Sequence, residues 1–478
     1  MTDLFPAGPH RSGRCAVGTT HPWSEKMAHQ NSPTQPDGDG APRAATVVVI
    51  GAGMAGLIAA RELRRRDIDV LVLESAGRPG GRVLAETTVL GSRVDLGGQW
   101  IGHGHHRFAT LAADLDAPVF AMRTPSRPSI VDGDTVVSNA GMTAVVANAV
   151  LLVWEIATRV GAPGSWRTRS LRSWLDHVPN RRARRLLTVI TSVSTTADLD
   201  RYSMHAFLDM IRFQGGFRTM LSTAGGAQES LVTAGAGTLA ERLAAELGDR
   251  VILDSAVTAI HRDDDGVTIR SATGTYRAAK VIVTVPPPTA ARIEHQPALP
   301  AARIHLQDNT YMGSVYKAIA IYDQPFWRDR TDAEMLALTE PGLATFDTSP
   351  PSGPGHLCVL VAGPEARALD ELDTDARRAA ILGPLAAHLG PEILAPRGWH
   401  EKSWHQDPHA GGGYTALPII GSDEGYLPID TTPLGHLHWA GSETASEHAG
   451  YIEGAIESGQ RSAAEVAAAL RDSPPVSM

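Results

Sequence analysis

The stretch TVVVIGAGMAGLIAARELRRRDIDVLVLES, residues 46–75, decides the fold of this chain. It opens with an apolar run over 46–50, which is typical of a parallel strand buried on both faces. Glycines follow at the spacing GxGxxG, and the apolar positions after them repeat with a helical period. A second apolar run over 70–73 ends at an acidic residue. The order of strand, helix, strand and acid predicts an α/β, Rossmann-like unit that binds a dinucleotide.

The residues of this motif have separate physical tasks. The glycines allow a tight turn and let a pyrophosphate approach the exposed amides at a helix N-terminus. The acid lies 18 positions after the last glycine, where it can accept hydrogen bonds from a ribose diol and repels a 2′-phosphate. The expected cofactor contacts of this unit are Gly51, Gly53, Ala55, Gly56 and Glu74.

Two further glycine-rich turns favour FAD over a nicotinamide cofactor. SAGRPGGRV follows the acid directly and brings Gly81 and Arg82 into a turn that suits phosphate and carries a positive charge. DLGGQWIG, residues 95–102, allows a third close backbone approach at Gly97 and Gly98. A nicotinamide fold does not need these elements, whereas an FAD that lies extended through a protein does. We therefore expect FAD.

Length, charge and cysteine content restrict the class of protein. A chain of 478 residues predicts two or three domains. The net charge of -9 argues against a partner nucleic acid. Cys15 and Cys358 form no disulfide framework, which fits a reducing compartment and a cytoplasmic location. The cluster HGHH at 103–106 lacks a suitably spaced carboxylate or cysteine, so no metal site is expected.

The sequence predicts a soluble protein without a membrane partner. Residues 1–44 are polar, lack the apolar core of a secretory signal and predict a disordered tail. The most apolar segment, MTAVVANAVLLVW at 142–154, is shorter than a membrane span and carries Asn148, which predicts a buried helix. The last residues, 472–478, are expected to form a short polar tail.

A second strand–turn–helix unit lies near the C-terminus. Within HLHWAGSETASEHAGYIEGAIESGQRSA, residues 437–440 predict a short strand, and apolar positions from about Gly450 onwards keep helical spacing. Such a unit so far from the first one predicts a discontinuous cofactor domain that the C-terminal segment completes.

The chain resembles the flavin-containing amine oxidases, which include monoamine, polyamine and putrescine oxidases. The resemblance runs from about Ala45 to Leu470 and rests on ordered motifs: VIGAGMAGL, GRPGGR, DLGGQWIG, GAQESLVTAGAGTLAERLA, VIVTVPPP, MGSVYKAI, FWR, GGGYT and HWAGSETASEHAGYIEGAIESGQRSA. It implies a mixed α/β fold in which an FAD-binding domain over 45–124, 225–299 and 406–471 alternates with a substrate domain over 125–224 and 300–405.

The same resemblance implies further cofactor contacts. In the family, the polar turn near the C-terminus touches the FAD phosphates, and the helix after it faces the pyrimidine edge of the flavin. A helix N-terminus there would stabilise negative charge on a reduced flavin. Val257 matches a position whose backbone contacts the adenine end, although it could equally be an ordinary strand valine. The implied contacts are Gly97, Gly98, Gln99, Trp100, Val257, Gly441, Ser442, Glu443 and Ile452.

One lysine stands out within GSVYKAIAIYD, residues 313–323. If this segment is a strand, Lys317 shares an apolar face with Val315 and Ile319. A buried lysine there needs a partner or a shifted pKa, unless its side chain reaches solvent at the strand end. By resemblance, Lys317 matches the family lysine that holds a water beside the reactive flavin nitrogen and assists reoxidation by oxygen.

Aromatic residues are the second part of the expected catalytic set. By resemblance, Tyr414 and Tyr451 form an aromatic cage that confines an amine before the flavin, and the electron-rich ring faces suit a polarised nitrogen. The glycines at 411–413 would let the backbone pass close to the flavin. The implied residues of the substrate cavity are Gln228, Leu221 and Trp404, of which Leu221 could also belong to the core.

Gly413 marks a departure from part of the family. In mitochondrial monoamine oxidases the residue before the cage tyrosine is a cysteine bonded to the flavin, and here it is Gly413. Those enzymes also carry a C-terminal membrane helix, whereas this chain ends in RDSPPVSM. We therefore expect non-covalent FAD and a soluble enzyme.

The expected reaction oxidises an amine to an imine, which hydrolyses, while oxygen becomes hydrogen peroxide. The expected partners are thus an amine and oxygen, and a homodimer is compatible with the sequence. An L-amino acid oxidase on the same fold is an alternative, but such enzymes place an arginine just after the motif that here reads DLGGQWIG. A biosynthetic flavin desaturase or dehydrogenase is a further alternative, against which Lys317 and the two tyrosines argue. A flavoprotein kept as a scaffold is another, against which the acidic balance of the chain argues.

Overall fold

The structure is a computed structural model, and it describes residues 42–123, 129–133, 135–138, 140–330, 335–339, 341–425 and 427–472. Residues 1–41, which include Cys15, and residues 473–478 lie outside the described part, and with them most of the two expected tails. The first strand nevertheless begins at Arg43, inside the range expected to be a tail. The last helix ends at Asp472, at the start of the second expected tail.

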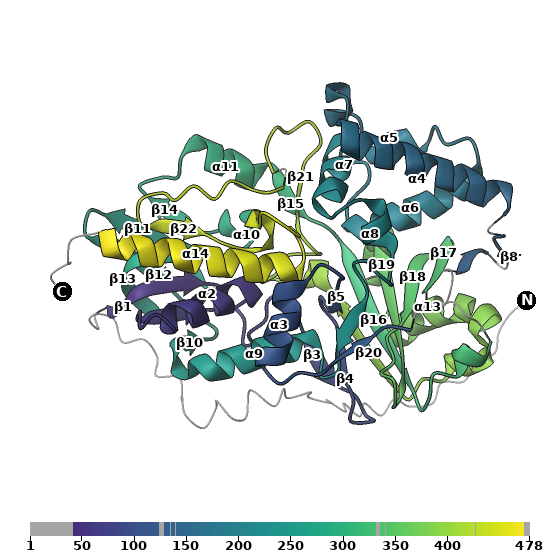
Figure 1. Cartoon of the computed structure of the whole chain (residues 1–478), viewed down its shortest axis with the longest axis horizontal. Coiled ribbons are helices and arrows are strands. Elements are labelled where there is room, and N and C mark those ends of the chain that lie inside the picture. The colour runs from purple at the N-terminus through teal and green to yellow at the C-terminus, as the bar shows by residue number, and fades with distance from the viewer. Residues whose placement is uncertain are drawn as a thin grey trace, which may run out of the picture. The chain divides into compact units, whose positions relative to one another are not determined.

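The first layer is an eight-stranded sheet with the order β10-β2-β1-β13-β12-β11-β14, to which β22 adds by pairing with β13 (Figure 1). The central strands β1, β2, β13 and β22 run parallel. Val47, Val48 and Val49 are fully buried, which explains the unbroken apolar run at the centre of this sheet. The strands are β1 (Arg43–Ile50), β2 (Val70–Leu73), β10 (Val251–Ile252), β11 (Val257–Asp263), β12 (Gly266–Ser271), β13 (Gly274–Val283), β14 (Glu294–Gln296) and β22 (Leu437–Trp439).

Helices from both ends of the chain cover this sheet together. The last helix packs along α2, and the backbone of Ala55 and the side chain of Ile58 contact Gly459 so closely that a larger residue would not fit there. The C-terminal segment therefore completes the layer that the first motif begins (Figure 1). The helices and short turns of this part are α2 (Met54–Arg64), α3 (His106–Asp114), α9 (Ala236–Leu247), η2 (Gly248–Arg250), α10 (Pro287–Ala290), α11 (Ala301–Asp308), η6 (Ser442–Thr444) and α14 (Ile452–Asp472).

The second large sheet has seven strands in the order β20-β16-β19-β18-β17-β7-β8. One face of β16, with Tyr316 and Ala318, packs on α13, and the other face, with Val315 and Ile319, belongs to a core shared with Trp404. The elements are β7 (Ser129–Asp132), β8 (Thr135–Val136), β16 (Val315–Tyr322), η3 (Phe326–Asp329), β17 (Met335–Thr339), β18 (Gly342–Asp347), β19 (Gly355–Ala362), α12 (Pro364–Leu369), α13 (Thr374–Leu389), η4 (Pro391–Leu394), β20 (Gly398–Ser403) and η5 (Trp404–Gln406).

A group of helices between residues 142 and 221 packs beside the second sheet (Figure 1). Its core is aromatic, since the buried Trp154 lies 5.3 Å from Phe207 and 5.6 Å from Phe217 by ring centroids. The elements are α4 (Met142–Val160), η1 (Gly164–Arg167), α5 (Leu171–Leu175), α6 (Arg181–Thr195), α7 (Met204–Phe213) and α8 (Phe217–Leu221).

The expected helix over 142–154 is confirmed, but the expectations that it is too short to span a membrane and that it is buried are wrong. The helix α4 continues to Val160, and only 28% of its most apolar window is buried. Among the described residues it is the one helix that is long and apolar enough to cross a membrane, judged by length and composition alone. It lies on the surface because only one of its faces, which includes Trp154, packs against α6 and α7.

Short sheets connect the two large ones. Strand β9 pairs with both β5 and β6, β3 pairs with β4, and β15 pairs with β21. The last pair brings the segment after the three glycines at 411–413 against the strand that precedes β16. These strands are β3 (Ala85–Thr87), β4 (Arg93–Asp95), β5 (Trp100–Ile101), β6 (Val119–Ala121), β9 (Ser230–Val232), β15 (Thr310–Met312) and β21 (Ala416–Pro418).

Candidate functional site

One long cavity of about 560 Å³ continues from the first sheet to the second and to the helices α6, α7 and α8. Residues at the carboxyl ends of parallel strands line its first part: Gly51 after β1, Glu74 after β2, Thr284 after β13 and Gly441 after β22. In open α/β sheets, ligands bind outside the carboxyl ends of the strands. The position of the cavity is therefore that of a ligand site.

The glycines after β1 have different neighbours. A Cβ atom at Gly53 would have no neighbouring atom within 4 Å, and Gly53 lines the cavity at the start of α2. A Cβ atom at Gly56 would collide with the carbonyl oxygen of Gly51. The open space above Gly53 and the amides at the N-terminus of α2 suit a pyrophosphate.

The carboxylate of Glu74 lies at the same edge of the sheet and is buried. It accepts hydrogen bonds from the amide of Ala52 at 2.6 Å and from the amide of Ala76 at 2.9 Å. These contacts tie the glycine turn to the segment after β2. The residue also lines the cavity, so that its carboxylate is positioned beside any group bound there.

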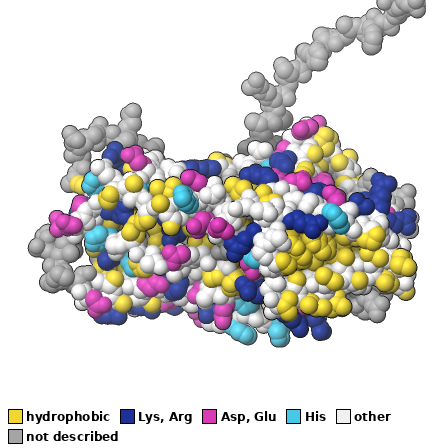
Figure 2. Space-filling model, turned by 90° about the horizontal axis from the view of Figure 1, so that it is seen from above, with side chains coloured by type: hydrophobic (Ala, Val, Ile, Leu, Met, Phe, Trp, Pro, Cys, Tyr) yellow, Lys and Arg dark blue, Asp and Glu magenta, His cyan; other side chains and the backbone are white. Residues whose placement is uncertain are grey.

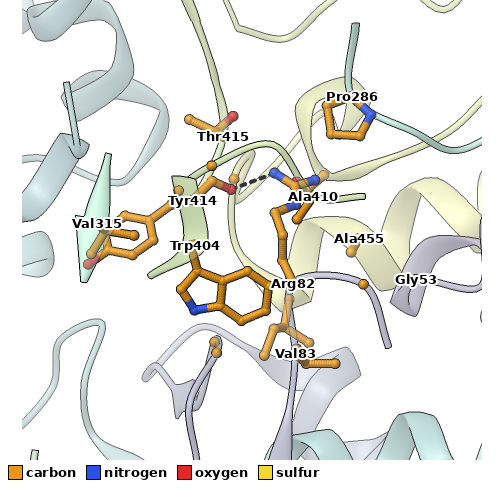
Figure 3. Close-up of a pocket in the computed structure, with 18 of the residues that line it drawn as sticks. Gly53, Arg82, Val83, Pro286, Val315, Trp404, Ala410, Tyr414, Thr415 and Ala455 are labelled. Atoms are coloured by element: carbon orange, nitrogen blue, oxygen red, sulfur yellow. Dashed lines mark hydrogen bonds between the residues drawn. The ribbon is translucent and has the colours of Figure 1, made fainter. Parts of the chain in front are cut away.

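Arg82 joins three segments that are distant in sequence. Its guanidinium donates to both carboxylate oxygens of the buried Glu443, at 2.7 and 3.1 Å. It also donates to the carbonyl oxygen of Tyr414 at 2.6 Å, as Figure 3 shows. Although burial opposes ionisation, Arg82 holds the pKa of Glu443 below its ordinary value. The positive charge expected at the second glycine turn is thus paired within the protein, a partner that local sequence does not reveal.

Lys317 is buried, with 3% of its surface exposed, so the alternative of a side chain that reaches solvent is wrong. Its ammonium donates to the carbonyl oxygen of Gly97 at 2.8 Å and to the side-chain oxygen of Gln99 at 2.6 Å. Burial lowers the pKa of Lys317, and the neighbouring Cys358 and Asp95 act in the opposite direction. The expected alternation is confirmed, because Val315 and Ile319 lie on the same face of β16.

Tyr414 and Tyr451 line the same cavity as Lys317. Burial raises the pKa of both phenols, and Tyr451 contributes to the shift at Tyr414, so the two groups lie near each other. The ring of His105 lies 5.0 Å from that of Tyr451, and burial, together with His448, lowers the pKa of His105 to about 3. Both tyrosines are therefore neutral at physiological pH, and their half-buried side chains line the cavity.

Contacts with neighbouring protein segments bear on the three glycines before Tyr414. A Cβ atom at Gly412 would collide with the backbone of Gly313, and one at Gly413 would collide with the side chain of Thr196. These contacts already require glycine at both positions. Close passage of a ligand, which we expected to be the reason, is not needed to explain Gly412 and Gly413, whereas Gly411 has a positive φ of 74° and no described protein atom nearer than 3.7 Å to its Cβ position.

Most of the residues expected from sequence meet at this cavity. Gly56 and Glu443 do not line it, because Gly56 contacts the turn at Gly51 from behind and Glu443 lies behind Arg82. The expected residues on the cavity wall are Gly51, Gly53, Ala55, Glu74, Gly81, Arg82, Gly97, Gly98, Gln99, Trp100, Leu221, Gln228, Val257, Lys317, Trp404, Tyr414, Gly441, Ser442, Tyr451 and Ile452.

The structure adds wall residues that sequence reasoning missed. Thr284 donates to the carbonyl oxygen of Ile50 at 2.8 Å and lies at the glycine turn, within the quoted motif VIVTVPPP. The far wall is apolar and comes from α6 and from the second sheet; its residues include Val189, Ile190, Val193, Phe346 and Leu360. Helical spacing marks those on α6, but it does not show which partner that face meets.

Two observations test whether the cavity fits a dinucleotide. The position of Gly53 leaves open space in front of a helix N-terminus, as a phosphate group needs. The hydroxyl of Thr415 is buried on the cavity wall and has no hydrogen-bond partner among the described residues. Buried polar groups are normally paired, so this hydroxyl suits a polar ligand atom. The cavity therefore fits a dinucleotide, and the fold and site define a dinucleotide-binding protein.

Comparisons with known proteins give the family. The model for flavin containing amine oxidoreductases matches residues 54–467. A protein of Mycobacterium tuberculosis that carries the name flavin-containing monoamine oxidase AofH is 37% identical over 443 residues, which are 89% of this chain and 97% of that protein. Flavin-containing amine oxidase A of Canis lupus familiaris is 30% identical over 89% of this chain and 85% of its own length.

Solved structures agree with this result. Cyclohexylamine oxidase from Brevibacterium oxydans superposes with a TM-score of 0.83 at 28% identity, over 89% of this chain and 99% of its own. Putrescine oxidase bound to putrescine gives a TM-score of 0.81 at 25% identity, over 90% and 100% of the two chains. The chain belongs to the flavin-containing amine oxidoreductase family. The predicted fold class is confirmed, and the protein is an FAD-dependent amine oxidase.

Proposed function

We propose that the cavity holds FAD non-covalently, with its phosphates at the turn after β1 and its redox-active ring beside Lys317, Tyr414 and Tyr451. When bound, FAD accepts two electrons from the amine and passes them to oxygen. The observation that carries this proposal is that Lys317 and both tyrosines line the cavity that begins at Gly53. The proposed cofactor contacts are Gly51, Gly53, Ala55, Glu74, Gly81, Arg82, Gly97, Gly98, Gln99, Trp100, Val257, Gly441, Ser442 and Ile452, with Glu443 acting through Arg82 and Gly56 through the shape of the turn.

The tyrosines would select and position the amine. Two half-buried rings on the cavity wall restrict the access of water, and desolvation disfavours the ammonium form of a substrate. The neutral amine, which carries the lone pair needed for oxidation, is thus favoured at the site. The imine product hydrolyses to an aldehyde or ketone and releases ammonia or an amine, and oxygen leaves as hydrogen peroxide.

Lys317 would act in the oxygen half of the reaction. Its ammonium is held by two oxygens and is close to the ring of Trp100, at 5.7 Å from the ring centroid. Fixed in this way, it can hold a water molecule and stabilise negative charge that develops on reduced oxygen. No other acid or base on the cavity wall is required by this reaction.

The cavity wall favours an apolar monoamine over a diamine. Among the described residues, the wall built from 189–228 and 337–360 carries no carboxylate that could bind a second ammonium group. It offers the amide of Gln228, which donates to the carbonyl oxygen of Met220 at 3.1 Å, and otherwise mainly apolar side chains such as Leu221. Trp404, fixed by a 2.7 Å bond to the carbonyl oxygen of Leu96, closes the wall beside Tyr414.

The non-covalent attachment rests on Gly413. The position offers no side chain for a bond to the flavin, and the contact with Thr196 leaves no room for one. Acid precipitation of the purified protein is expected to release the yellow cofactor into solution. Colour that stays with the precipitated protein contradicts this part of the proposal.

The domain organisation and the location are proposed on the same basis. The strands of the first sheet come from the three ranges assigned to FAD binding, and the second sheet comes from the ranges assigned to the substrate. We therefore propose a cofactor domain over 45–124, 225–299 and 406–471 and a substrate domain over 125–224 and 300–405. A cytoplasmic location is proposed from the cysteine content, and a homodimer is compatible with it.

A peroxide-coupled screen tests the function. Hexylamine and benzylamine are expected to yield peroxide, with putrescine a poorer substrate and the corresponding L-amino acids inactive. Turnover of amino acids but not of amines would favour the amino acid oxidase. A flavin that no amine reduces under anaerobic conditions contradicts the proposed function as a whole.

A further inference from the structure

Helix α4 presents an apolar face to solvent. Six of its side chains are large, apolar and exposed, among them Leu152 at 60%, Ile156 at 52% and Val160 at 78%. Most monomeric proteins do not expose so continuous an apolar area without a partner. The α4 face is defined here as Met142, Val145, Leu152, Val153, Ile156 and Val160.

The α4 face follows from helix geometry and is not a local irregularity. Its members are separated by three, seven, one, three and four positions, and at about 100° per residue all six fall within about 100° of the helix circumference, so they form one stripe. The opposite stripe, with Thr143, Ala147 and Trp154, is buried against α6 and α7. Of the polar residues of α4, only Asn148 and Arg159 are exposed, and both lie along one edge of the stripe. The helix is therefore amphipathic, with its apolar side turned to the exterior.

The surroundings of the α4 face are basic in an otherwise acidic protein. Residues 141–221 contain eleven arginines and no lysine against five acidic residues, which gives a net charge of +6, while the whole chain carries -9. Exposed arginines lie on α6, α7 and α8, which adjoin α4, at Arg181, Arg182, Arg212 and Arg218. In Figure 2, apolar side chains gather as one area over this end of the protein, with Lys and Arg side chains along its border.

We propose that the α4 face docks the enzyme onto an anionic lipid surface. Amphipathic helices with an apolar side and basic flanks lie in the plane of a membrane interface, where apolar burial and attraction to anionic headgroups act together. The alternative occupant, a second copy of the chain, would bring this face against itself in a symmetric dimer. Such a contact places the basic border of one copy opposite that of the other, which is unfavourable. The lipid surface replaces our expectation of no membrane partner.

Docking through α4 orients the substrate wall of the cavity. Helices α6, α7 and α8 line that wall with Val189, Met210 and Leu221, and α6 and α7 contact α4 on the other side. The bound enzyme would therefore hold the apolar end of its cavity close to the lipid phase. Apolar amines partition into that phase, which raises their local concentration.

Vesicle flotation with the full-length holoenzyme tests the proposal. The protein is expected to float with phosphatidylcholine vesicles that contain phosphatidylglycerol, and much less with pure phosphatidylcholine or at high salt. The variant L152Q/I156Q is expected to lose about 10-fold in binding, because two apolar contacts become polar. R181E/R218E is expected to weaken binding similarly and to reduce its dependence on salt.

A matched control shows whether a loss of vesicle binding is specific to the α4 face or follows from any increase in surface polarity. V89Q/L394Q changes two side chains that are exposed to a similar degree, 69% and 52%, but lie outside the helical group. It should bind vesicles as the unchanged protein does, and all three variants should keep their FAD and oxidise a soluble amine at the normal rate. Failure to bind anionic vesicles, or binding that L152Q/I156Q leaves unchanged, would overturn the proposal. So would a dimer in sedimentation experiments that L152Q/I156Q dissociates while vesicle binding is absent.

Discussion

The guanidinium of Arg82 and the carboxylate of Glu443 form a two-bond ion pair, at 2.7 and 3.1 Å, between residues 361 positions apart. The pair joins the second glycine turn to the turn before α14, and the bond from Arg82 to the carbonyl oxygen of Tyr414 adds the segment of the aromatic cage. Three segments that meet at the cofactor cavity thus depend on one cation. The pair acts as a connection between distant parts of the chain and leaves no unpaired charge for a phosphate.

Removal of the carboxylate should therefore be costly. Glu443→Gln leaves the partly buried Arg82 without its counter-ion, and we expect a loss of about 3 kcal/mol in the free energy of unfolding, together with weaker FAD retention. Urea unfolding and the ratio of flavin to protein absorbance measure the two effects. The double variant R82M/E443M should recover part of the stability, because the pair is removed together. A loss below about 1 kcal/mol in E443Q would falsify the connecting role.

The glycine turn allows a comparison of two neighbouring alanine substitutions. A Cβ atom at Gly53 enters open cavity space, so Gly53→Ala should fold normally and lose at least about 10-fold in FAD affinity. A Cβ atom at Gly56 meets the carbonyl oxygen of Gly51, so Gly56→Ala should unfold at a lower temperature even without FAD. Thermal unfolding of the two apoproteins and titration with FAD distinguish the effects. Equal thermal destabilisation by both changes contradicts the assignment of the open space to a ligand.

Some of these structural features could be predicted from the sequence, and others could not. The strand at 46–50 and the alternation around Lys317 could be predicted, because a buried strand leaves a local pattern of apolar residues. The partner of Arg82 could not, since a contact across 361 positions leaves no local pattern. The exposed side of α4 was also missed, because helical spacing shows that two faces differ but not which of them meets the core. The resemblance brought Tyr414 and Tyr451 to one site, whereas the far wall on α6 depends on packing alone.

The proposed role of Lys317 predicts that its replacement affects flavin reoxidation by oxygen more than flavin reduction by the amine. Lys317→Met keeps the length and apolar stem but removes the ammonium, and we expect reoxidation by oxygen to slow by about 100-fold. Reduction by the amine should change much less. Stopped-flow absorbance of the flavin, with anaerobic reduction and aerobic reoxidation followed separately, provides both rates. Equal slowing of both halves, at unchanged FAD content, contradicts a role confined to oxygen.

The cage hypothesis predicts that amine turnover depends on the aromatic rings of the two tyrosines and much less on their hydroxyl groups. Tyr414→Phe and Tyr451→Phe keep the aromatic faces, so each should retain amine turnover within about 10-fold. Tyr414→Ala and Tyr451→Ala open the cage to water, and kcat/KM should fall by at least about 100-fold, while FAD stays bound. Steady-state kinetics with benzylamine compare the four variants. If the Phe and Ala variants lose activity equally, the phenol hydroxyls carry the function and the cage account is wrong.

Asp95 offers a pH test of the link between β4 and the N-terminus of α9. Its buried carboxylate accepts the amides of Ala236 and Gly237 at 2.8 and 3.0 Å, and burial raises its pKa to about 6, partly opposed by these bonds and by Lys317.

Because this pKa is raised from 3.8, the folded state binds more protons than the unfolded state between about pH 4 and 6, and the contribution of Asp95 to stability falls as pH rises through that window. The difference in the free energy of unfolding between the unchanged protein and Asp95→Asn should therefore fall by about 2 kcal/mol from pH 4 to 6.5 and stay nearly constant above. Asp263 is the matched control of opposite sign, since the bond from Arg277 lowers its pKa to about 2. The corresponding difference for Asp263→Asn should fall only as the pH drops from about 4 to about 2. Urea unfolding of the holoproteins at several pH values measures both profiles, and a flat profile for Asp95 between pH 4 and 6.5 shows that its carboxylate keeps an ordinary pKa.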